Sequence, residues 1–190
     1  MILKKRAFRK KEFSIIFLLI MLSAFQNIVS QEITNNVKIA FLEKFTRFIN
    51  WPDESSLADS SNIFLITIIG TDSITKEIYN FYKTRKIKGR NVKINYISNI
   101  SEITECHLLF IANSEKESLE QIIDYTKERP ILTISDTDGF AEKGVLINLF
   151  SLKNQLRFQI NETAVKTSGL YVNFRLLNLA KIVNPVREGK

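Results

Sequence analysis

The sequence contains few of the residues from which catalytic and metal centres are built. Its 190 residues include one cysteine and one histidine, Cys106 and His107. A structural zinc site needs about four nitrogen or sulfur ligands, and a hydrolytic triad needs a base beside its nucleophile. The six glycines are scattered, so no glycine-rich phosphate loop is present. These absences predict a protein that is not an enzyme and that holds no metal or cofactor.

Cys106 has no second cysteine with which to pair, which excludes an intrachain disulfide. It stands beside His107 at the start of an apolar run. A free cysteine in such a place behaves as a small apolar side chain. We therefore expect a buried thiol next to a structural imidazole.

A strong charge of one sign is also missing once the two ends of the chain are separated. The whole chain has a formal net charge of +7, but residues 1–30 contain six basic residues and one acidic residue. Residues 31–190 therefore keep a net charge of only +2. Because their lysines and arginines are scattered among acidic residues, nucleic acid is not an expected partner.

The first thirty residues follow the order of a secretory signal peptide. Basic residues precede an apolar run from Phe13 to Phe25. This run is shorter than the ~20 residues that cross a bilayer, which favours cleavage over a membrane anchor. The small side chain of Ser30 places the cut near Ser30 and Gln31. We expect residues 1–30 to be the signal peptide and residues 31–190 to form one periplasmic domain.

The remaining chain has the pattern of an α/β protein. Four apolar, β-branched runs are separated by segments of helical period: Ile63–Ile69, Val92–Ile97, His107–Ala112 and Ile131–Ser135. This alternation predicts parallel strands joined by right-handed crossovers. Two later runs, Val145–Phe150 and Gln155–Ile160, are close enough to form a hairpin. The expected fold is a single mixed sheet, with four parallel-type strands plus a C-terminal antiparallel hairpin, and with helices on both faces.

Helices are predicted at both ends of the domain. Apolar residues in steps of three and four favour a helix from Thr34 to Asn50, which Trp51-Pro52 ends. Asn161 is expected to cap a second helix with an apolar stripe from Val165 to Val183. Gly169 lies within that stripe, which indicates close packing on the sheet.

Short motifs along the chain resemble, in the same order, those of the YfiR-like family of small periplasmic proteins. The matching segments are Asn50-Trp51-Pro52, Phe64 to Gly70, Lys88-Gly89-Arg90, Cys106 to Ile111, Pro130 to Asp136, Gly144 to Ile147, Arg157 to Asn161, Ser168-Gly169-Leu170 and Leu176 to Ala180. They span the chain from about Val37 to Val183. Each motif alone is weak, but their shared order is specific.

The resemblance implies a periplasmic regulatory protein that represses a membrane-bound signalling enzyme, a diguanylate cyclase or a histidine kinase, by contacting its periplasmic domain. It also implies an outer-membrane lipoprotein that removes the regulator, and it is compatible with a homodimer. A disulfide-based redox switch is not carried over, because Cys106 is alone. Trp51, Asp136 and Arg157 each match a motif and are able to make contacts, so we nominate them as partner-binding residues. Roles in the core would explain them equally well.

A different function, the binding of a small solute, is the main alternative. Open α/β sheets usually bind ligands at the carboxyl ends of their strands. Three polar segments follow predicted strands: Gly70-Thr71-Asp72, Asn113-Ser114 and Asp136-Thr137-Asp138. The same segments also resemble helix caps and turns, with Thr71-Asp72-Ser73 and Ser114 to Glu117 as caps. An enzyme is a third alternative, which the lack of catalytic motifs does not favour.

Overall fold

The computed structural model describes residues 35–52 and 63–183. The chain divides into two units, residues 1–37 and residues 38–190, and the account below concerns the second. The expected signal peptide and its cut near Ser30 and Gln31 lie outside the described residues. Within the two described ranges, no helix combines the length and the apolar character that a bilayer crossing requires.

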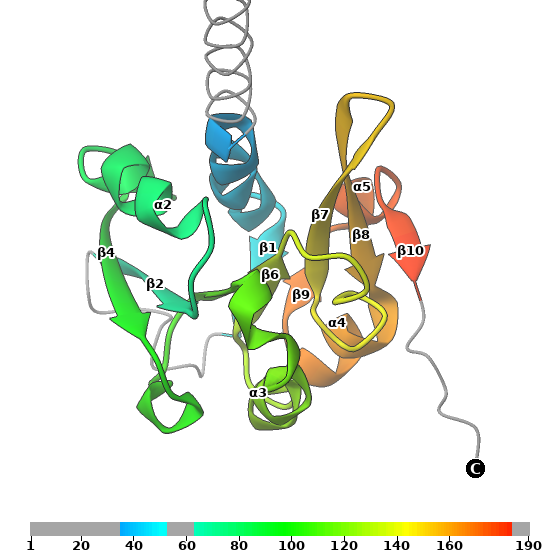
Figure 1. Ribbon diagram of the computed structural model, residues 1–190. Helices are drawn as coiled ribbons and strands as arrows, with labels where there is room; N and C mark the ends of the chain where they lie inside the picture. Colours follow the sequence, from blue (N-terminus) through cyan, green and yellow to red (C-terminus); the bar gives the residue numbers. More distant parts are fainter. Residues whose placement is uncertain (1–34, 53–62, 184–190) are drawn as a thin grey trace, which may run out of the picture. The chain divides into compact units, whose positions relative to one another are not determined.

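The centre of the domain is a mixed sheet with strand order β10-β8-β7-β6-β5-β2-β4-β3 (Figure 1). The strands are β2 (Ile63–Ile69), β3 (Lys86–Ile87), β4 (Arg90–Ile97), β5 (Leu108–Ile111), β6 (Leu132–Ser135), β7 (Ile147–Leu152), β8 (Gln155–Asn161) and β10 (Lys181–Val183). Strands β4, β2, β5, β6 and β7 are parallel, and β7 and β8 pair antiparallel. The predicted mixed sheet with a C-terminal hairpin is confirmed.

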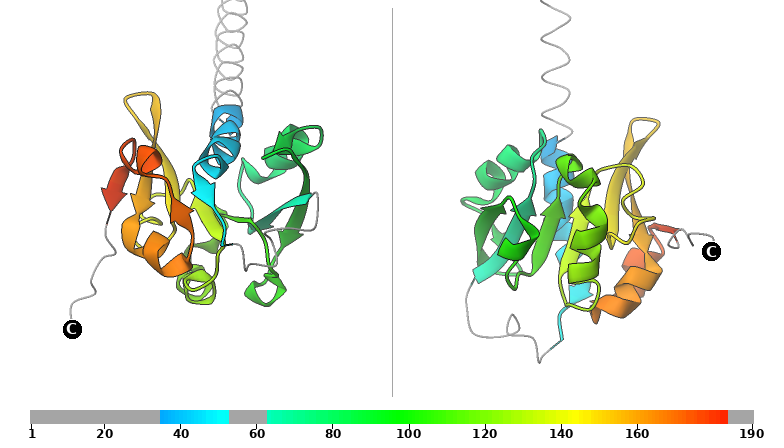
Figure 2. Two further views of the ribbon diagram at one scale, coloured as in Figure 1. Left: turned by 180° about the vertical axis from the view of Figure 1, so that it is seen from behind. Right: turned by 60° about the horizontal axis from the view of Figure 1, so that its bottom comes forward.

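Helices cover both faces of this sheet. They are residues 38–46 of a first helix that begins at residue 35, α2 (Thr75–Tyr82), α3 (Leu119–Thr126), α4 (Glu162–Ser168) and α5 (Phe174–Leu177), with 3-10 turns η1 (Ile100–Glu102) and η2 (Asn113–Lys116). Figure 2 shows the first helix and α3 on opposite sides of the sheet. A separate two-stranded sheet pairs β1 (Ile49–Asn50) with β9 (Tyr171–Val172).

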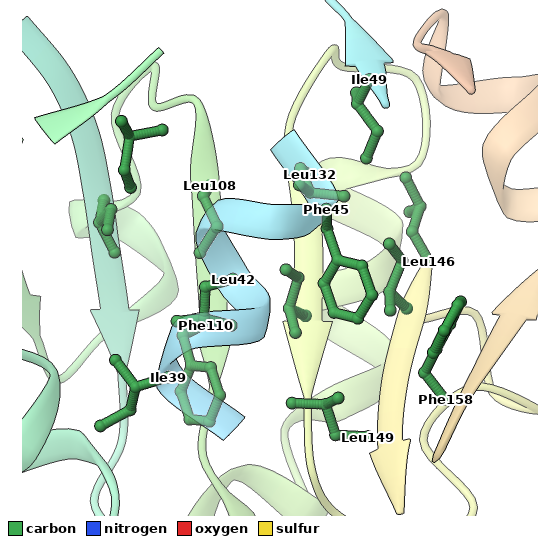
Figure 3. Packing of buried hydrophobic residues seen from close by; sticks show 14 of the residues in the cluster. Ile39, Leu42, Phe45, Ile49, Leu108, Phe110, Leu132, Leu146, Leu149 and Phe158 are labelled. Carbon is green, nitrogen blue, oxygen red and sulfur yellow. The ribbon is translucent and has the colours of Figure 1, made fainter. Parts of the chain in front are cut away.

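The alternation of buried residues along the central strands explains why they need cover on both faces. In β5, Leu108 and Phe110 belong to the core beneath the first helix, whereas Leu109 and Ile111 belong to the core beneath α3. Figure 3 shows the first helix lying across the strands, with Leu42 and Phe45 directed at them. A strand that is apolar on both sides is typical of a parallel sheet.

The first helix is shorter than predicted, because it ends at residue 46 rather than at Asn50. Ile49 and Asn50 instead form β1, where they pair with Val172 and Tyr171. Trp51-Pro52 therefore ends a strand. The pairing partner lies more than 120 residues away in the sequence, so local periodicity could not reveal it.

The predicted long C-terminal helix is also wrong. Asn161 caps α4 as expected, since its side chain accepts a hydrogen bond from the amide of Ala164. However, the helix stops at Gly169, which adopts a left-handed conformation (φ 73°). Nothing lies within 4 Å of a Cβ built there, so Gly169 serves as a helix terminator and not as a packing contact. The chain then continues as β9, α5 and β10.

Candidate functional site

A cleft of about 580 Å³ lies where the carboxyl ends of the parallel strands meet. Its lining residues are Lys38, Asp72, Ser73, Asn113, Lys116, Asp136, Thr137, Asp138, Leu149, Phe150 and Ser151. All three polar segments that were predicted for this edge contribute at least one of these side chains. The cleft is therefore a candidate place for a small ligand, at the edge where the sequence predicted one.

Asp72 is fixed at the start of α2 by the backbone. One of its carboxylate oxygens accepts hydrogen bonds from the amides of Ile74 and Thr75, both at 3.0 Å. The other oxygen accepts a longer bond of 3.4 Å from the amide of Asn113. Asp72 thus satisfies two amides at the start of α2 as predicted, although the N-cap residue itself is Ile74, and these bonds orient its carboxylate at the edge of the cleft.

Ser114 does not form the capping box that its sequence suggested. The helix α3 begins five residues later, at Leu119, and residues Asn113–Lys116 form a 3-10 turn instead. The hydroxyl of Ser114 accepts a hydrogen bond from the amide of Thr71 at 2.9 Å. It therefore joins the loops that follow β2 and β5, both of which contribute residues to the cleft.

Asp136 holds the first helix and the cleft together. Its carboxylate pairs with the ammonium of Lys38 at 2.7 Å, and the two side chains are 15% and 18% exposed. The loop that carries Asp136 is anchored by Ser135, whose hydroxyl donates to the carbonyl of Ile111 and accepts from the amide of Thr137. The two residues are 98 positions apart in the sequence, so the helical period of the first helix does not indicate this pairing.

The cleft has more negative than positive groups, because three aspartates face two lysines. Burial, followed by the negative charge of Asp136, raises the pKa of Asp72 above its ordinary value, although the backbone hydrogen bonds from Thr75, Ile74 and Asn113 act in the opposite direction. Asp72 is therefore a carboxylate whose negative charge is only partly balanced by its surroundings.

One hydroxyl in the cleft wall has no hydrogen-bond partner among residues 35–52 and 63–183. It belongs to Thr137, which is only 9% exposed. A buried hydroxyl without a partner costs free energy unless a ligand or a water supplies one. In the same ranges, no three histidine, cysteine or acidic side chains are placed to hold a metal ion.

A second cluster, which we call the aromatic cluster, lies at the amino ends of the strands. It consists of Trp51, Phe64 and His107. The rings of Phe64 and His107 stack with centroids 4.5 Å apart, and Trp51 meets them edge-on at 5.8 and 5.9 Å. Arg90 also approaches Nε2 of His107 at 3.3 Å, so four of the family-like motifs converge here.

The contacts of His107 are those of a residue that joins strands. Its Nδ1 accepts a hydrogen bond from the amide of Leu65 at 3.0 Å, and its backbone bonds to Leu65 and Leu132 on the two neighbouring strands. Beside it, the ammonium of Lys88 lies 5.2 Å from the ring of Trp51 and donates to the carbonyl of Ile49. Partial burial and the charge of Arg90 lower the pKa of Lys88.

The structure does not bring the three nominated residues together. Asp136 lies in the cleft at the carboxyl ends of the strands, and half-buried Trp51 lies in the aromatic cluster at the amino ends. Arg157 is exposed on β8, where it donates to the side chain of Gln155 and pairs in register with Phe150. Each therefore belongs to a different part of the surface.

The chain also exposes large apolar side chains over a short stretch that lies within the predicted C-terminal helix. We call this stretch, residues 171–182, the C-terminal apolar surface. Its exposed members are Tyr171, Phe174, Leu179 and Ile182, of which Tyr171 and Phe174 are 61% and 62% exposed. Because Asn50 pairs with Tyr171, this surface begins one residue away from Trp51 in the register of β1 and β9.

Comparisons with known proteins find a family model and solved structures that are similar to the chain. A model of the YfiR/HmsC-like family matches residues 35–181. A conserved domain protein from Vibrio cholerae O1 biovar El Tor has a TM-score of 0.54 at 8% identity, over 78% of this chain and 59% of that one. An ABC domain from Streptococcus pneumonia, solved with L-Trp, has a TM-score of 0.48 at 11% identity, over 63% and 56%.

The chain thus spans less than two thirds of the length of either solved protein. At 8% identity, the likeness to the Vibrio cholerae protein shows a shared fold and nothing more. A comparison with curated proteins gives no match.

Proposed function

This chain belongs to the YfiR/HmsC-like family, and on that premise we propose that it is a periplasmic protein that represses a membrane-bound signalling enzyme by direct contact. The observation that carries the proposal is the family match, which covers nearly all of the described residues. The proposed partner is the periplasmic domain of an inner-membrane diguanylate cyclase or histidine kinase. An outer-membrane lipoprotein would remove the regulator, and the regulator itself would act as a monomer or a homodimer.

The C-terminal apolar surface is the best candidate for the contact. Tyr171 and Phe174 are each more than half exposed, and aromatic side chains are the residues most often found at the centre of protein interfaces. Arg175 and Lys181 lie within the same stretch and are exposed, which favours a partner with acidic groups around an apolar centre. Trp51, at the end of β1, would extend this surface.

Repression by contact requires the regulator to distinguish two states of its partner. A ligand that binds both states equally changes nothing, whatever its affinity. If the inactive state is bound more tightly by about 3 kcal/mol, the active state is depleted more than a hundredfold. No catalytic group is needed for this effect, in agreement with a regulatory rather than an enzymatic role.

The proposal is tested by capture of the tagged full-length protein from solubilised envelopes, together with the output of the captured enzyme. We expect a signalling enzyme to co-purify and to lose activity when the regulator is added. Tyr171→Ala should weaken both effects by at least about tenfold. Tyr79→Ala is the matched control, since this tyrosine is 53% exposed on α2. Equal effects of the two variants would contradict the assignment of the surface, and capture of no signalling enzyme would contradict the function.

Export is tested on the same tagged protein. We expect it in the periplasmic fraction with its new N-terminus near Gln31, because the leader has the order of a cleavable signal. A full-length product in the cytosol would contradict both the localisation and the regulatory proposal.

Binding of a small solute is a second candidate function, and the cleft is the observation that favours it. Its volume of about 580 Å³ lies within the range of small-molecule sites, and its lining mixes charged, hydroxyl and aromatic groups. A solute that binds the folded state raises the melting temperature of the isolated protein. Solute binding and partner binding are compatible, because the cleft and the C-terminal apolar surface have no lining residue in common.

A further inference from the structure

We propose that the cleft binds a small organic cation that carries hydroxyl groups, with its ammonium group between Asp72 and Asp136 and a hydroxyl group at Thr137. This inference rests on the second proposed function, the binding of a small solute, and names the chemistry of that solute. Four observations on the lining residues support it.

The first observation is the balance of charge. Asp72, Asp136 and Asp138 face Lys38 and Lys116, so the cleft has one formal negative charge that no lysine balances. Asp136 is already paired with Lys38, which leaves Asp72 as the fixed carboxylate that forms no ion pair within residues 35–52 and 63–183. A bound cation would lower the repulsion between Asp72 and Asp136, whereas an anion would increase it.

The second observation separates an organic cation from a metal ion. In the part of the chain that the structure describes, no three histidine, cysteine or acidic side chains are grouped to hold a metal. Calcium takes six to eight oxygen ligands, and magnesium requires a nearly ideal octahedron. By contrast, an ammonium group needs only two or three acceptors, which Asp72 and Asp136 supply.

The third observation is the hydroxyl of Thr137, which is buried in the wall of the cleft and has no partner among the described residues. Ser73, Asn113 and Ser151 add further polar groups around the same space. A ligand with hydroxyl groups would satisfy such a lining, whereas a purely apolar amine would leave Thr137 unpaired.

The fourth observation is the size and the apolar side of the cleft. A volume of about 580 Å³ accommodates a ligand of the size of a sugar. Phe150 and Leu149 supply the apolar part of the lining. The ammonium of Lys181 already lies 6.0 Å from the centroid of the Phe150 ring, so Phe150 counts only as apolar lining and the aspartates carry the preference for a cation.

A substitution of Lys38 distinguishes a cationic from an anionic ligand, because it should change their affinities in opposite directions. If the ligand is a cation, its ammonium competes with Lys38 for Asp136, and Lys38→Met should tighten binding by about tenfold. If the ligand is an anion, the same substitution should weaken binding. Lys127→Met is the matched control, because Lys127 forms an ion pair with Asp124 on the exposed side of α3.

The test uses three sugars of similar size that differ in charge: glucosamine as the cation, glucose as the neutral probe and glucuronate as the anion. Isothermal titration of the mature protein at neutral pH should show saturable binding of glucosamine alone. Asp72→Asn should weaken it about tenfold, while Asp124→Asn leaves it unchanged. The asparagine keeps the oxygen that caps α2, and a circular dichroism spectrum confirms that each variant is folded.

The outcomes separate the inference from the function on which it rests. Binding of glucose or glucuronate as tight as that of glucosamine would overturn the assignment of charge but leave solute binding standing. Binding of none of the three would overturn the inference and remove the support for solute binding. Weaker binding by Lys38→Met would also overturn the inference. The proposed regulation of a partner is untouched by these results, because it is measured by co-purification.

Discussion

The two ends of the parallel strands differ in how their side chains use space. At the amino ends, the rings of Phe64 and His107 stack, Trp51 meets both edge-on, and the three rings fill the edge of the sheet. At the carboxyl ends, short polar side chains leave a cleft of about 580 Å³. The same strands supply both ends, so the difference comes from the residues that flank them.

This difference shows that motif residues serve two purposes in this fold. The motifs that contain Trp51, Arg90 and His107 meet in the aromatic cluster, where they join strands. The motif that ends in Asp136 lies at the cleft, where its carboxylate pairs with Lys38. We therefore expect a substitution in the aromatic cluster to change stability more than substitutions at the cleft do. Four predictions, from the largest effect to the smallest, test that division.

The largest effect is expected for Phe64→Ala in the aromatic cluster. Phe64 is fully buried and contacts both Trp51 and His107, so its removal leaves a cavity and two rings without their neighbour. The free energy of unfolding should fall by about 3–5 kcal/mol. Urea unfolding measures it, with the exposed Phe174→Ala as the control that should change it by less than about 0.5 kcal/mol.

A smaller loss of stability is expected for Gly70→Ala at the cleft. Gly70 has φ +81°, which costs a residue with a Cβ about 1–2 kcal/mol, and a Cβ there would also collide with the side chains of Ser114 and Glu115. Gly139→Ala is the matched control, because Gly139 has the same φ and no atom within 4 Å of the added Cβ. Chemical unfolding should show the larger loss for Gly70→Ala. Equal losses would mean that Ser114 and Glu115 move aside freely.

A gain in stability is expected for Asp72→Asn at neutral pH. Burial and Asp136 raise the pKa of Asp72 in the folded protein, so the folded state binds this proton more tightly than the unfolded state does. Protonation of Asp72 stabilises the folded state fully below the pKa that Asp72 has in the unfolded state. This stabilisation is lost as the pH rises through the higher pKa that Asp72 has in the folded state. The asparagine variant should therefore be more stable than the wild type above both pKa values of Asp72, and equally stable in acid below them. Unfolding at several pH values measures it, and a loss of stability at neutral pH would contradict the raised pKa.

The smallest effect is expected for iodoacetamide treatment of the native protein. The buried thiol of Cys106 should not react, so stability should not change. Burial raises the pKa of Cys106 to about 11 from 9.0. This shift lowers the fraction of reactive thiolate at neutral pH about a hundredfold, and burial slows access further. Mass spectrometry should find alkylation only after unfolding. Rapid labelling of the native protein would contradict the buried environment.

How much could be predicted from the sequence depended on whether the decisive contact was local. The run Ile63–Ile69 is apolar on both faces, and it correctly predicted a central strand. Asp72 correctly predicted the start of α2. By contrast, Gly169 was read as a packing residue, because its left-handed conformation ends the helix in a way that periodicity does not show.

The candidate site was predicted in part for the same reason. Asp72 and Asp136 were expected at the carboxyl edge, because strand order and handedness follow from general rules. Lys38 was not, since its partner is 98 residues away. Nor did the sequence reveal that Trp51 and Asp136 occupy opposite ends of the sheet.

The sequence by itself determined the family, the parallel strands and the residues that end those strands, because each depends on side chains close together along the chain. Only the tertiary structure decided that His107 stacks on Phe64 at one end of the strands. It also decided that Lys38 pairs with Asp136 at the other end and that an acidic cleft remains open there. The physical reason is that charge pairing and hollow space depend on which distant segments the packed sheet brings into contact.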